Sequence, residues 1–222
     1  RFESQALMLR ERLGALTSLA VSLGLAPVTT FADVDRLARL IGLRSQNTRP
    51  DRQWFTRSGL GDARAAAVSL REHAAALNDA EATASAVFTS DALRAPLADL
   101  QDRFTNLHKG LKKLSGNYRA DKRTVAALLT NATDVKNGIN HLSEAVAWGE
   151  TSRAFDTLVA THAGLLGSHW AGRATNFEAL HSAFNAVDEV LTLTDGNPPS
   201  QLVTYLTGSD SNDAYQTVVD TA

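Results

Sequence analysis

The chain of 222 residues carries a formal net charge of −2, and 44% of its residues are hydrophobic, 21% charged and 6% aromatic. This composition excludes a disordered chain and indicates a globular protein with room for one large domain or two modest ones. The absence of cysteine excludes disulfides and thiolate metal sites and favours a cytoplasmic location. No stretch approaches the ~20 apolar residues of a membrane span, so we expect no membrane partner.

The first part of the chain predicts two helices. Leucine and alanine recur at helical spacing in residues 3–24, and Gly24 and Pro27 end this segment. Thr30 has the hydroxyl that an N-cap needs, so a second helix is expected at 31–43. Both segments place apolar residues on one side, as helices on the surface of a core do.

The next stretch, "RSQNTRPDRQWFTRSGLG" at 44–61, predicts a connector with a short helix around Trp54, because it is polar and contains proline and glycine. Trp54 and Phe55 are interpreted as large side chains buried at a helix junction. Because four arginines surround them, stacking on nucleic-acid bases stays open as an alternative. These arginines are Arg44, Arg49, Arg52 and Arg57.

Two long helices are expected at 62–88 and 134–164, well above the average helix length of about 11–12 residues. Each carries an apolar seam, so we predict that the two helices pair in a long antiparallel coiled-coil arm within 61–164. The seam residues expected to face one another are Leu70, Leu77 and Phe88 on the first helix and Ile139, Leu142 and Val146 on the second. Residues 1–60 and 165–222 would then form a compact helical base.

The other helices are shorter, and we expect them at 91–109, 119–130, 177–194, 199–206 and 210–220. Pro96 fits a helix only within its first turns, and Asn176 is a suitable N-cap. Trp148 falls on the apolar stripe of a long helix and is predicted to lie in the core. Because no segment has the pattern of a strand, the sequence predicts an all-α fold.

The two ends of the chain resemble interior segments of a protein. The first residues, "RFESQALMLRERL", contain neither an initiator methionine nor the apolar region of a signal peptide. The last residues, "AYQTVVDTA", stop inside an amphipathic pattern. We therefore expect a piece of a longer protein.

Several common catalytic and cofactor motifs are missing from the sequence. It contains no G-x-x-x-x-G-K-[ST], no G-x-S-x-G and no H-E-x-x-H, and "GLLGSHWAG" at 164–172 lacks the lysine of a phosphate loop. His141 and Glu144 share a helix face, but two potential ligands do not make a metal site. We expect no cofactor, no metal and no catalytic residue in this segment, and whether the whole protein is an enzyme stays open.

The strongest local signal is a basic segment from Arg103 to Arg123, in which seven basic residues stand against one acid. The i, i+3, i+4 spacing predicts that Lys109, Lys112 and Lys113 share one helical face, and nearby glycines let the backbone turn. Such a surface can hold a nucleic-acid backbone through its phosphates without reading the bases. The candidate contact residues are Arg103, Lys109, Lys112, Lys113, Tyr118, Arg119, Lys122 and Arg123.

A second interpretation of the basic segment is a solvated corner between two helices, in which lysine stems cover Leu111 and Leu114. The wider charge distribution is also uneven, because residues 177–222 contain seven acids and no Lys or Arg. Such polarity steers a polyanion toward one end of a protein, although ordinary solvated helix faces produce it as well.

Two stretches carry a family pattern, "RFTNLHKGLKKLSGNYRADKRTVAALL" at 103–129 and "LLGSHWAGRATNFEALHSAFNAVDEVL" at 165–191. The residues that match the pattern are Arg103, Phe104, Leu111, Leu114, Tyr118, Arg119 and Asp121, followed by Leu166, Gly167, Gly172, Thr175, Asn176 and Phe177. In this respect the chain resembles the helical insertion of large bacterial superfamily 1 helicases. Those proteins have a P-loop ATPase core and, in many cases, a nuclease-like C-terminal domain.

The resemblance implies a helical accessory domain of an ATP-dependent DNA helicase. Its partners would be single-stranded DNA and the ATPase core of the parent chain. Because every ATPase motif is missing here, ATP binding and hydrolysis are expected of the parent alone, and no catalytic residue follows from the resemblance. The alternative is a helical bundle that serves as a scaffold for protein partners and has no nucleic-acid role.

Overall fold

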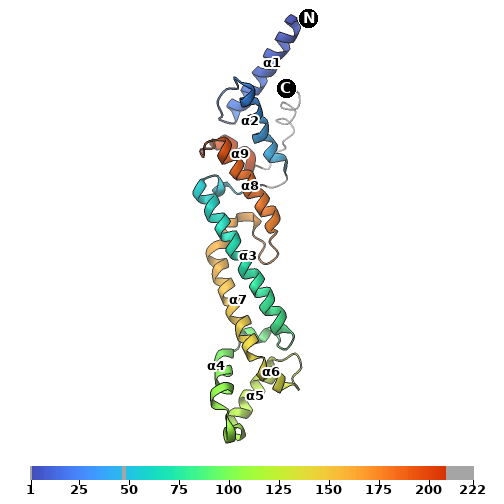
Figure 1. Ribbon diagram of the computed structural model, residues 1–222, viewed down its shortest axis with the longest axis vertical. Coiled ribbons are helices and arrows are strands. Elements are labelled where there is room, and N and C mark those ends of the chain that lie inside the picture. The colour runs from blue at the N-terminus through green and yellow to red at the C-terminus, as the bar shows by residue number, and fades with distance from the viewer. Residues whose placement is uncertain (1, 47–48, 209–222) are drawn as a thin grey trace. The chain divides into compact units, whose positions relative to one another are not determined.

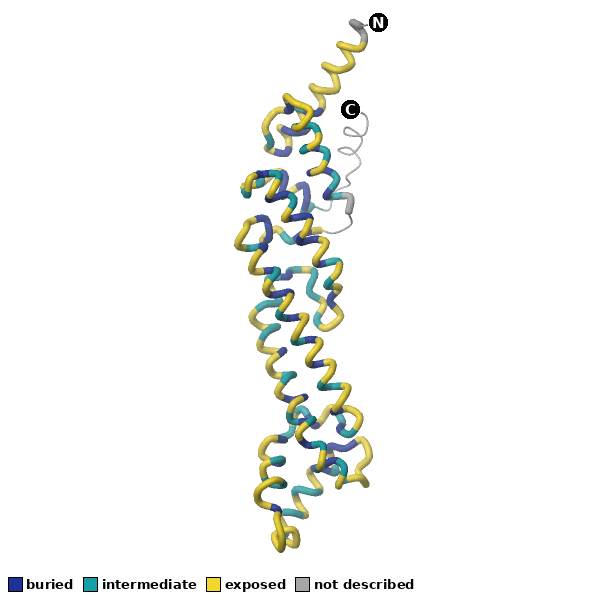
Figure 2. The backbone as a smooth tube through the Cα atoms, viewed as in Figure 1, coloured by how far each residue is buried: buried dark blue, intermediate teal, exposed yellow. Residues whose placement is uncertain are grey.

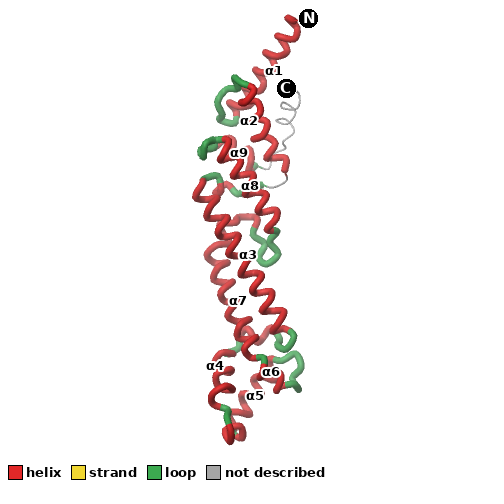
Figure 3. Tube along the Cα trace, viewed as in Figure 1, coloured by secondary structure: helices red, strands yellow, loops and turns green. Residues whose placement is uncertain are grey.

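The computed structural model describes residues 2–46 and 49–208 (Figure 1). Its α-helices are α1 (Phe2–Ser22), α2 (Phe31–Gly42), α3 (Arg57–Ser85), α4 (Leu97–Asp102), α5 (Gly116–Leu128), α6 (Val135–Asn140), α7 (Leu142–His162), α8 (Phe177–Leu193) and α9 (Ser200–Thr207). In this described part of the chain every segment is helix or loop, with no strand (Figure 3). The all-α prediction is confirmed there, while the helix expected at 210–220 lies outside the described residues.

Contacts between Cα atoms divide the chain into two compact units. One unit comprises residues 1–67 and 164–222, and the other comprises residues 68–163. Buried and exposed residues alternate along the long helices (Figure 2). In α3 the buried residues recur mostly every three or four positions, which is the spacing of one helix face.

The N-terminus of α2 is closed by a capping box. The Thr30 hydroxyl accepts the backbone N–H of Asp33 at 3.2 Å, and the Asp33 carboxylate accepts the backbone N–H of Thr30 at 2.8 Å. Hydrogen bonds from the backbone of Thr29 and the hydroxyl of Thr30 lower the pKa of Asp33 to about 2. The predicted N-cap is confirmed, and it sets the start of a helix whose residues Leu37, Leu40 and Ile41 are buried.

Trp54 is a large side chain of the first unit and is 0% exposed. Its indole Nε1–H donates to the carbonyl oxygen of Leu165 at 2.7 Å, and its ring centroid lies 4.8 Å from that of Phe184. Phe55 is buried beside it in sequence. The interpretation of both residues as core anchors is confirmed, and complete burial excludes base stacking by Trp54.

The glycine-containing segment 164–172 forms part of the same packing. The side-chain amide of Gln53 donates to the carbonyl oxygens of Gly164 at 3.0 Å and Leu165 at 3.1 Å. Gly167 has a φ of 55°, which favours glycine, and an added Cβ would collide with the Asp51 carboxylate. Gly167 therefore allows a tight turn of the backbone at this point.

Helix α8 begins where the sequence predicts. The Asn176 side chain accepts the backbone N–H of Ala179 at 3.0 Å and so caps the helix. The apolar stripe of α8 is buried. Glu189 of the same helix forms an ion pair with Arg39 of α2, with 2.7 Å between Oε1 and Nη2. This exposed pair adds little stability, because such pairs contribute about 0–1 kcal/mol.

The second unit, 68–163, contains an apolar core cluster, whose buried residues are Phe88, Ala92, Leu97, Leu100, Val125, Leu128, Leu129, Leu142 and Ala145. Phe88 and Leu142, two predicted seam residues, share this cluster, and Ile139 and Val146 pack against it. Leu70 and Leu77 of α3 are also buried, although they lie outside the cluster. Trp148 of α7 is buried as predicted.

Two backbone hydrogen bonds tie the segment after α3 to the end of α5. The N–H of Thr89 donates to the carbonyl of Leu128 at 2.8 Å, and the N–H of Thr130 donates to the carbonyl of Val87 at 3.0 Å. These two bonds flank an isolated antiparallel β-bridge between Phe88 and Leu129. The bridge satisfies buried backbone groups that would otherwise cost free energy.

The prediction of a single helix at 91–109 is wrong. The chain forms a 3-10 turn at Ser90–Arg94, then α4, then a π-helical turn at Arg103–Leu107. Ala95 is extended, with φ −85° and ψ 153°, as a residue before proline prefers. Pro96 therefore ends one turn and precedes the next helix, so it does not lie inside a helix.

The continuous helix predicted at 134–164 is also interrupted. Asp134 caps α6 as expected, but His141 leaves the helical conformation at φ −106° and ψ 15°, and α7 starts after it. Gly138 lies against the side chain of Leu129, where a Cβ would approach the leucine methyl carbons to 2.5 Å. Close packing of α6 on the end of α5 thus accompanies the break.

Phe88→Ala tests the core of the second unit. The ring is 1% exposed at the centre of the cluster, so its removal should lower the free energy of unfolding by about 3–5 kcal/mol. Phe31→Ala is the matched control, because Phe31 is 91% exposed and its loss should change the free energy by less than ~0.5 kcal/mol. Chemical denaturation of both variants measures the difference, and equal effects would contradict this assignment of the core.

Candidate nucleic-acid interface

The candidate surface, which we call the basic corner, is formed by residues 109–123 at the turn that leads into α5 (Figure 1). It comprises Lys109, a 3-10 turn at Gly110–Leu114, the cap residue Ser115 and most of α5. The Ser115 hydroxyl accepts the N–H of Tyr118 at 3.2 Å, which starts the helix. A short turn followed by a capped helix therefore presents the basic side chains.

The prediction that three lysines share one α-helical face is wrong. Lys109 is extended, with φ −111° and ψ 148°, and Gly110 has a φ of 56° that favours glycine. Lys112 and Lys113 lie in the 3-10 turn, where side chains repeat every three residues, so the i, i+4 relation does not hold. All three lysines are nevertheless exposed.

A carboxylate inside the corner links it to the preceding segment. Asp121 of α5 accepts hydrogen bonds from Arg103, Nε to Oδ2 at 2.9 Å and Nη2 to Oδ1 at 3.1 Å. Nε2 of His108 donates to Oδ2 of the same carboxylate at 2.6 Å. The bidentate pair and the buried imidazole fix the π-helical turn and His108 against the first half of α5.

The electrostatics of this cluster favour an ionised carboxylate. Burial raises the pKa of Asp121, but the hydrogen bonds from Arg103 and His108 outweigh that effect and hold the pKa below its ordinary value. The hydrogen bond to Asp121 raises the pKa of Arg103. Arg103, a candidate contact residue, is therefore paired within the protein and offers less charge to a ligand than the sequence indicates.

The other candidate cations remain toward solvent. Lys109, Lys112, Lys113, Arg119 and Arg123 are exposed, and Lys122 is half-buried. Within the unit 68–163, the six cations of the corner are accompanied by one acid, whereas the rest of that unit carries five cations and ten acids. The unit is thus neutral as a whole and strongly basic at one place, which concentrates a local positive potential.

Tyr118 is half-buried and belongs to a group of three aromatic rings. Its centroid lies 5.1 Å from the His108 ring and 6.0 Å from the Phe104 ring, both edge-on. The Nζ of Lys122 lies 5.8 Å from the Tyr118 ring centroid. Beside these rings is a pocket of about 280 Å³ lined by Phe104, His108, Lys109, Gly110, Lys113, Tyr118 and Ile139.

The apolar residues of the turn were expected to lie under lysine stems, and this part of the solvated-corner interpretation is wrong. Leu111 is 86% exposed and Leu114 is 72% exposed. Leu107, just before the corner, is exposed as well. Three leucines in solvent next to three lysines make a mixed apolar and cationic surface. The sequence did not predict this surface, because helical periodicity assigns the leucines inward.

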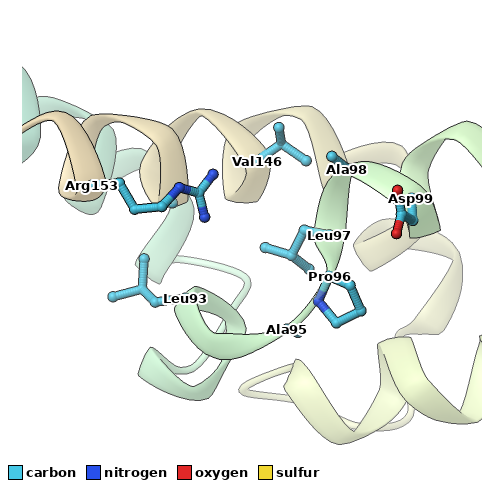
Figure 4. Close-up of a pocket in the computed structure, with 9 residues that line it drawn as sticks. Leu93, Ala95, Pro96, Leu97, Ala98, Asp99, Val146 and Arg153 are labelled. Carbon is cyan, nitrogen blue, oxygen red and sulfur yellow. The ribbon is translucent and has the colours of Figure 1, made fainter.

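A second, smaller pocket of about 120 Å³ lies between the start of α4 and α7 (Figure 4). Figure 4 shows Pro96 and Leu97 between the guanidinium of Arg153 on one side and the carboxylate of Asp99 on the other. The two charged groups are separated by apolar side chains and do not converge on one point. This arrangement lacks the grouped polar atoms of a catalytic or cofactor site.

Other classes of site have no counterpart among the described residues. In those residues no group of three or more His, Asp and Glu side chains is placed to hold a metal ion. No helix of the same part of the chain combines the length and hydropathy that a membrane span requires. Comparisons with protein-family models, with curated proteins and with solved structures found no match to this chain.

Asp121→Asn tests the link between the corner and the preceding turn. At neutral pH it should destabilise the protein by about 1–3 kcal/mol, because Arg103 and the buried His108 lose their anionic partner. The folded-state pKa of Asp121 is lowered, so its contribution is present above the unfolded value of about 3.9 and is lost as pH falls through the folded value.

The gap in stability between wild type and Asp121→Asn should therefore close as denaturation is repeated from pH 7 down to pH 3 and below. Asp91→Asn is the control, since the pair of Asp91 with Arg94 is long at 3.8 Å and exposed. A constant gap at every pH, or an equal effect of the control, would contradict the ionic link.

Proposed function

We propose that the basic corner binds single-stranded nucleic acid through its phosphates, with little dependence on base sequence. The observation that carries the proposal is the separation of charge within one neutral unit. Six cations stand together at 109–123, and the one acid among them is occupied by Arg103 and His108. A polyanion gains from such a surface by releasing the counterions of each phosphate that a cation replaces.

Phosphate contact is favoured over base reading by the side chains available. The corner contains a single amide side chain, Asn117, and no pair of Asn or Gln residues that could read base edges in a groove. Its cations lie on a short turn and the helix after it, not along one long helix that would enter a major groove. The exposed leucines and Tyr118 suit unpaired bases, whose flat faces are open.

We further propose that the chain is a non-catalytic accessory domain of an ATP-dependent DNA helicase. The support is the resemblance of residues 103–129 and 165–191 to the helical insertion of bacterial superfamily 1 enzymes. In this proposal the ATPase core of the parent chain is the partner that hydrolyses ATP. A cytoplasmic location is part of the same proposal and fits the absence of cysteine.

The long antiparallel coiled-coil arm is proposed within the unit 68–163. Its support is the placement of Phe88, just after α3, in one apolar cluster with Leu142 at the start of α7. The burial of Leu77, about three helical turns earlier in α3, agrees with a seam that continues along the helix. The basic corner would then lie beyond one end of this arm.

A second candidate function is a scaffold for protein partners. One observation favours it, namely the exposure of Leu107, Leu111 and Leu114 on adjoining turns. Exposed apolar side chains that lie together are typical of surfaces that contact another molecule. Charge separates the two candidates, because nucleic-acid binding must weaken with salt whereas apolar docking changes little.

Replacement of Lys109, Lys112, Lys113 and Lys122 by Gln should lower affinity for a single-stranded oligonucleotide and flatten its salt dependence. Each phosphate that the protein no longer neutralises reduces the slope of log K against log salt by ~0.7, so the four substitutions together reduce it by up to ~3. Fluorescence anisotropy between ~50 and ~200 mM salt measures the slope, and circular dichroism checks that helix content is unchanged.

The matched control replaces four cations elsewhere in the same unit, Arg71, Arg94, Lys136 and Arg153, by Gln. It removes the same charge but leaves the corner intact, so binding should stay close to that of wild type. If both variants lose the same affinity, binding depends on net charge and not on the basic corner, which would contradict the proposal. Absence of binding by the wild-type chain at ~50 mM salt would overturn it.

Leu77→Asp tests the arm. A carboxylate at this buried position should lower the free energy of unfolding by several kcal/mol, since it places an unpaired charge among apolar side chains. Val68→Asp, at an exposed position of α3, serves as the control. A wild-type melting temperature for Leu77→Asp would be incompatible with a seam along this helix.

A further inference from the structure

We infer that the aromatic pocket beside the basic corner receives one unpaired nucleobase, while Lys109 and Lys113 contact the adjoining phosphates. The inference rests on the proposed function and adds to it a defined subsite. Two of the lining residues, Phe104 and His108, lie before the corner, and Ile139 comes from α6. The subsite therefore combines three separate segments of the unit.

The size and walls of the pocket suit one flat ring. Its volume of about 280 Å³ lies just below the ~300–1,000 Å³ typical of pockets that enclose a drug-sized ligand. Three residues with aromatic rings, Phe104, His108 and Tyr118, are among the lining residues, and Ile139 is an aliphatic one. Aromatic side chains of this kind stack on every base, because each base has a π face.

The charge around the pocket decides what class of ring it takes. Aromatic walls can also enclose a cation, such as a quaternary ammonium group. Here two lysines, Lys109 and Lys113, are among the lining residues, and the nearby carboxylate of Asp121 already accepts hydrogen bonds from Arg103 and His108. A cationic ligand would meet repulsion from the two lysines, whereas an aromatic ligand with attached phosphates is attracted.

The pocket is held in shape before any ligand arrives. His108 is buried, its Nε2 is fixed 2.6 Å from Asp121, and its ring lies 5.2 Å from Phe104 and 5.1 Å from Tyr118. Gly110, whose φ is positive, is among the lining residues and adds no side chain to the pocket. Little ordering is then required on binding, which favours affinity.

Comparison of a short oligothymidylate with a strand of the same length whose sugars carry no bases tests the inference on the unaltered chain. Both strands have the same phosphates, so the salt dependence should be the same. The strand with bases should bind roughly 5- to 150-fold more tightly, which is the fold-change expected for stacking of one base. Anisotropy at ~100 mM salt measures both affinities.

Tyr118→Leu should bring the affinity of the strand with bases close to that of the baseless strand, with an unchanged salt slope. Tyr118→Phe keeps the ring and should bind like wild type. Equal wild-type affinities for the two strands, with salt dependence intact, would overturn the subsite and leave the proposed function standing. No salt-dependent binding of either strand would overturn both.

Discussion

The carboxylate of Asp121 is held by two side chains that come from an earlier turn of the chain. Arg103 binds it with two hydrogen bonds, and His108 binds it with one at 2.6 Å. These bonds join the π-helical turn to α5 across the glycine-containing segment between them. His108 belongs to this junction and also lines the pocket beside Phe104 and Tyr118, so the junction helps to set the shape of that pocket.

Both segments that this junction links also contribute a residue to the apolar core of the same unit. Leu100 at one end of the linked segments and Val125 at the other both belong to the cluster around Phe88. Arg103 and Asp121 therefore lie one turn of chain beyond buried positions, on backbones whose directions the core already restricts. An ionic contact of this kind needs that support, because isolated exposed pairs gain little. The basic corner thus adjoins a packed core, while most of its own cations stay in solvent.

Local signals in the sequence predicted the elements that local chemistry controls. Thr30 and Asn176 cap the helices expected of them, and the bulk of Trp54 and Trp148 brought both into the core. The failures have equally physical causes. Pro96 forces the preceding residue into an extended conformation, which periodicity alone does not reveal. The positive φ of Gly110 and the shorter 3-10 repeat rearrange the lysines and expose Leu111 and Leu114. The pairing of Arg103 with Asp121 spans eighteen positions, so it depends on the tertiary fold.

The distribution of tryptophan has a practical consequence for observing the molecule. Trp54 is buried in the unit formed by 1–67 and 164–222, and Trp148 is the one tryptophan of the unit 68–163. Trp170 belongs to the first of these units. In a chain with phenylalanine in place of Trp54 and Trp170, the tryptophan fluorescence would thus come from the second unit alone. Trp148 is therefore an intrinsic fluorescence probe for the unit that bears the basic corner. Its emission during denaturation would show whether this unit unfolds in the same step as the other unit.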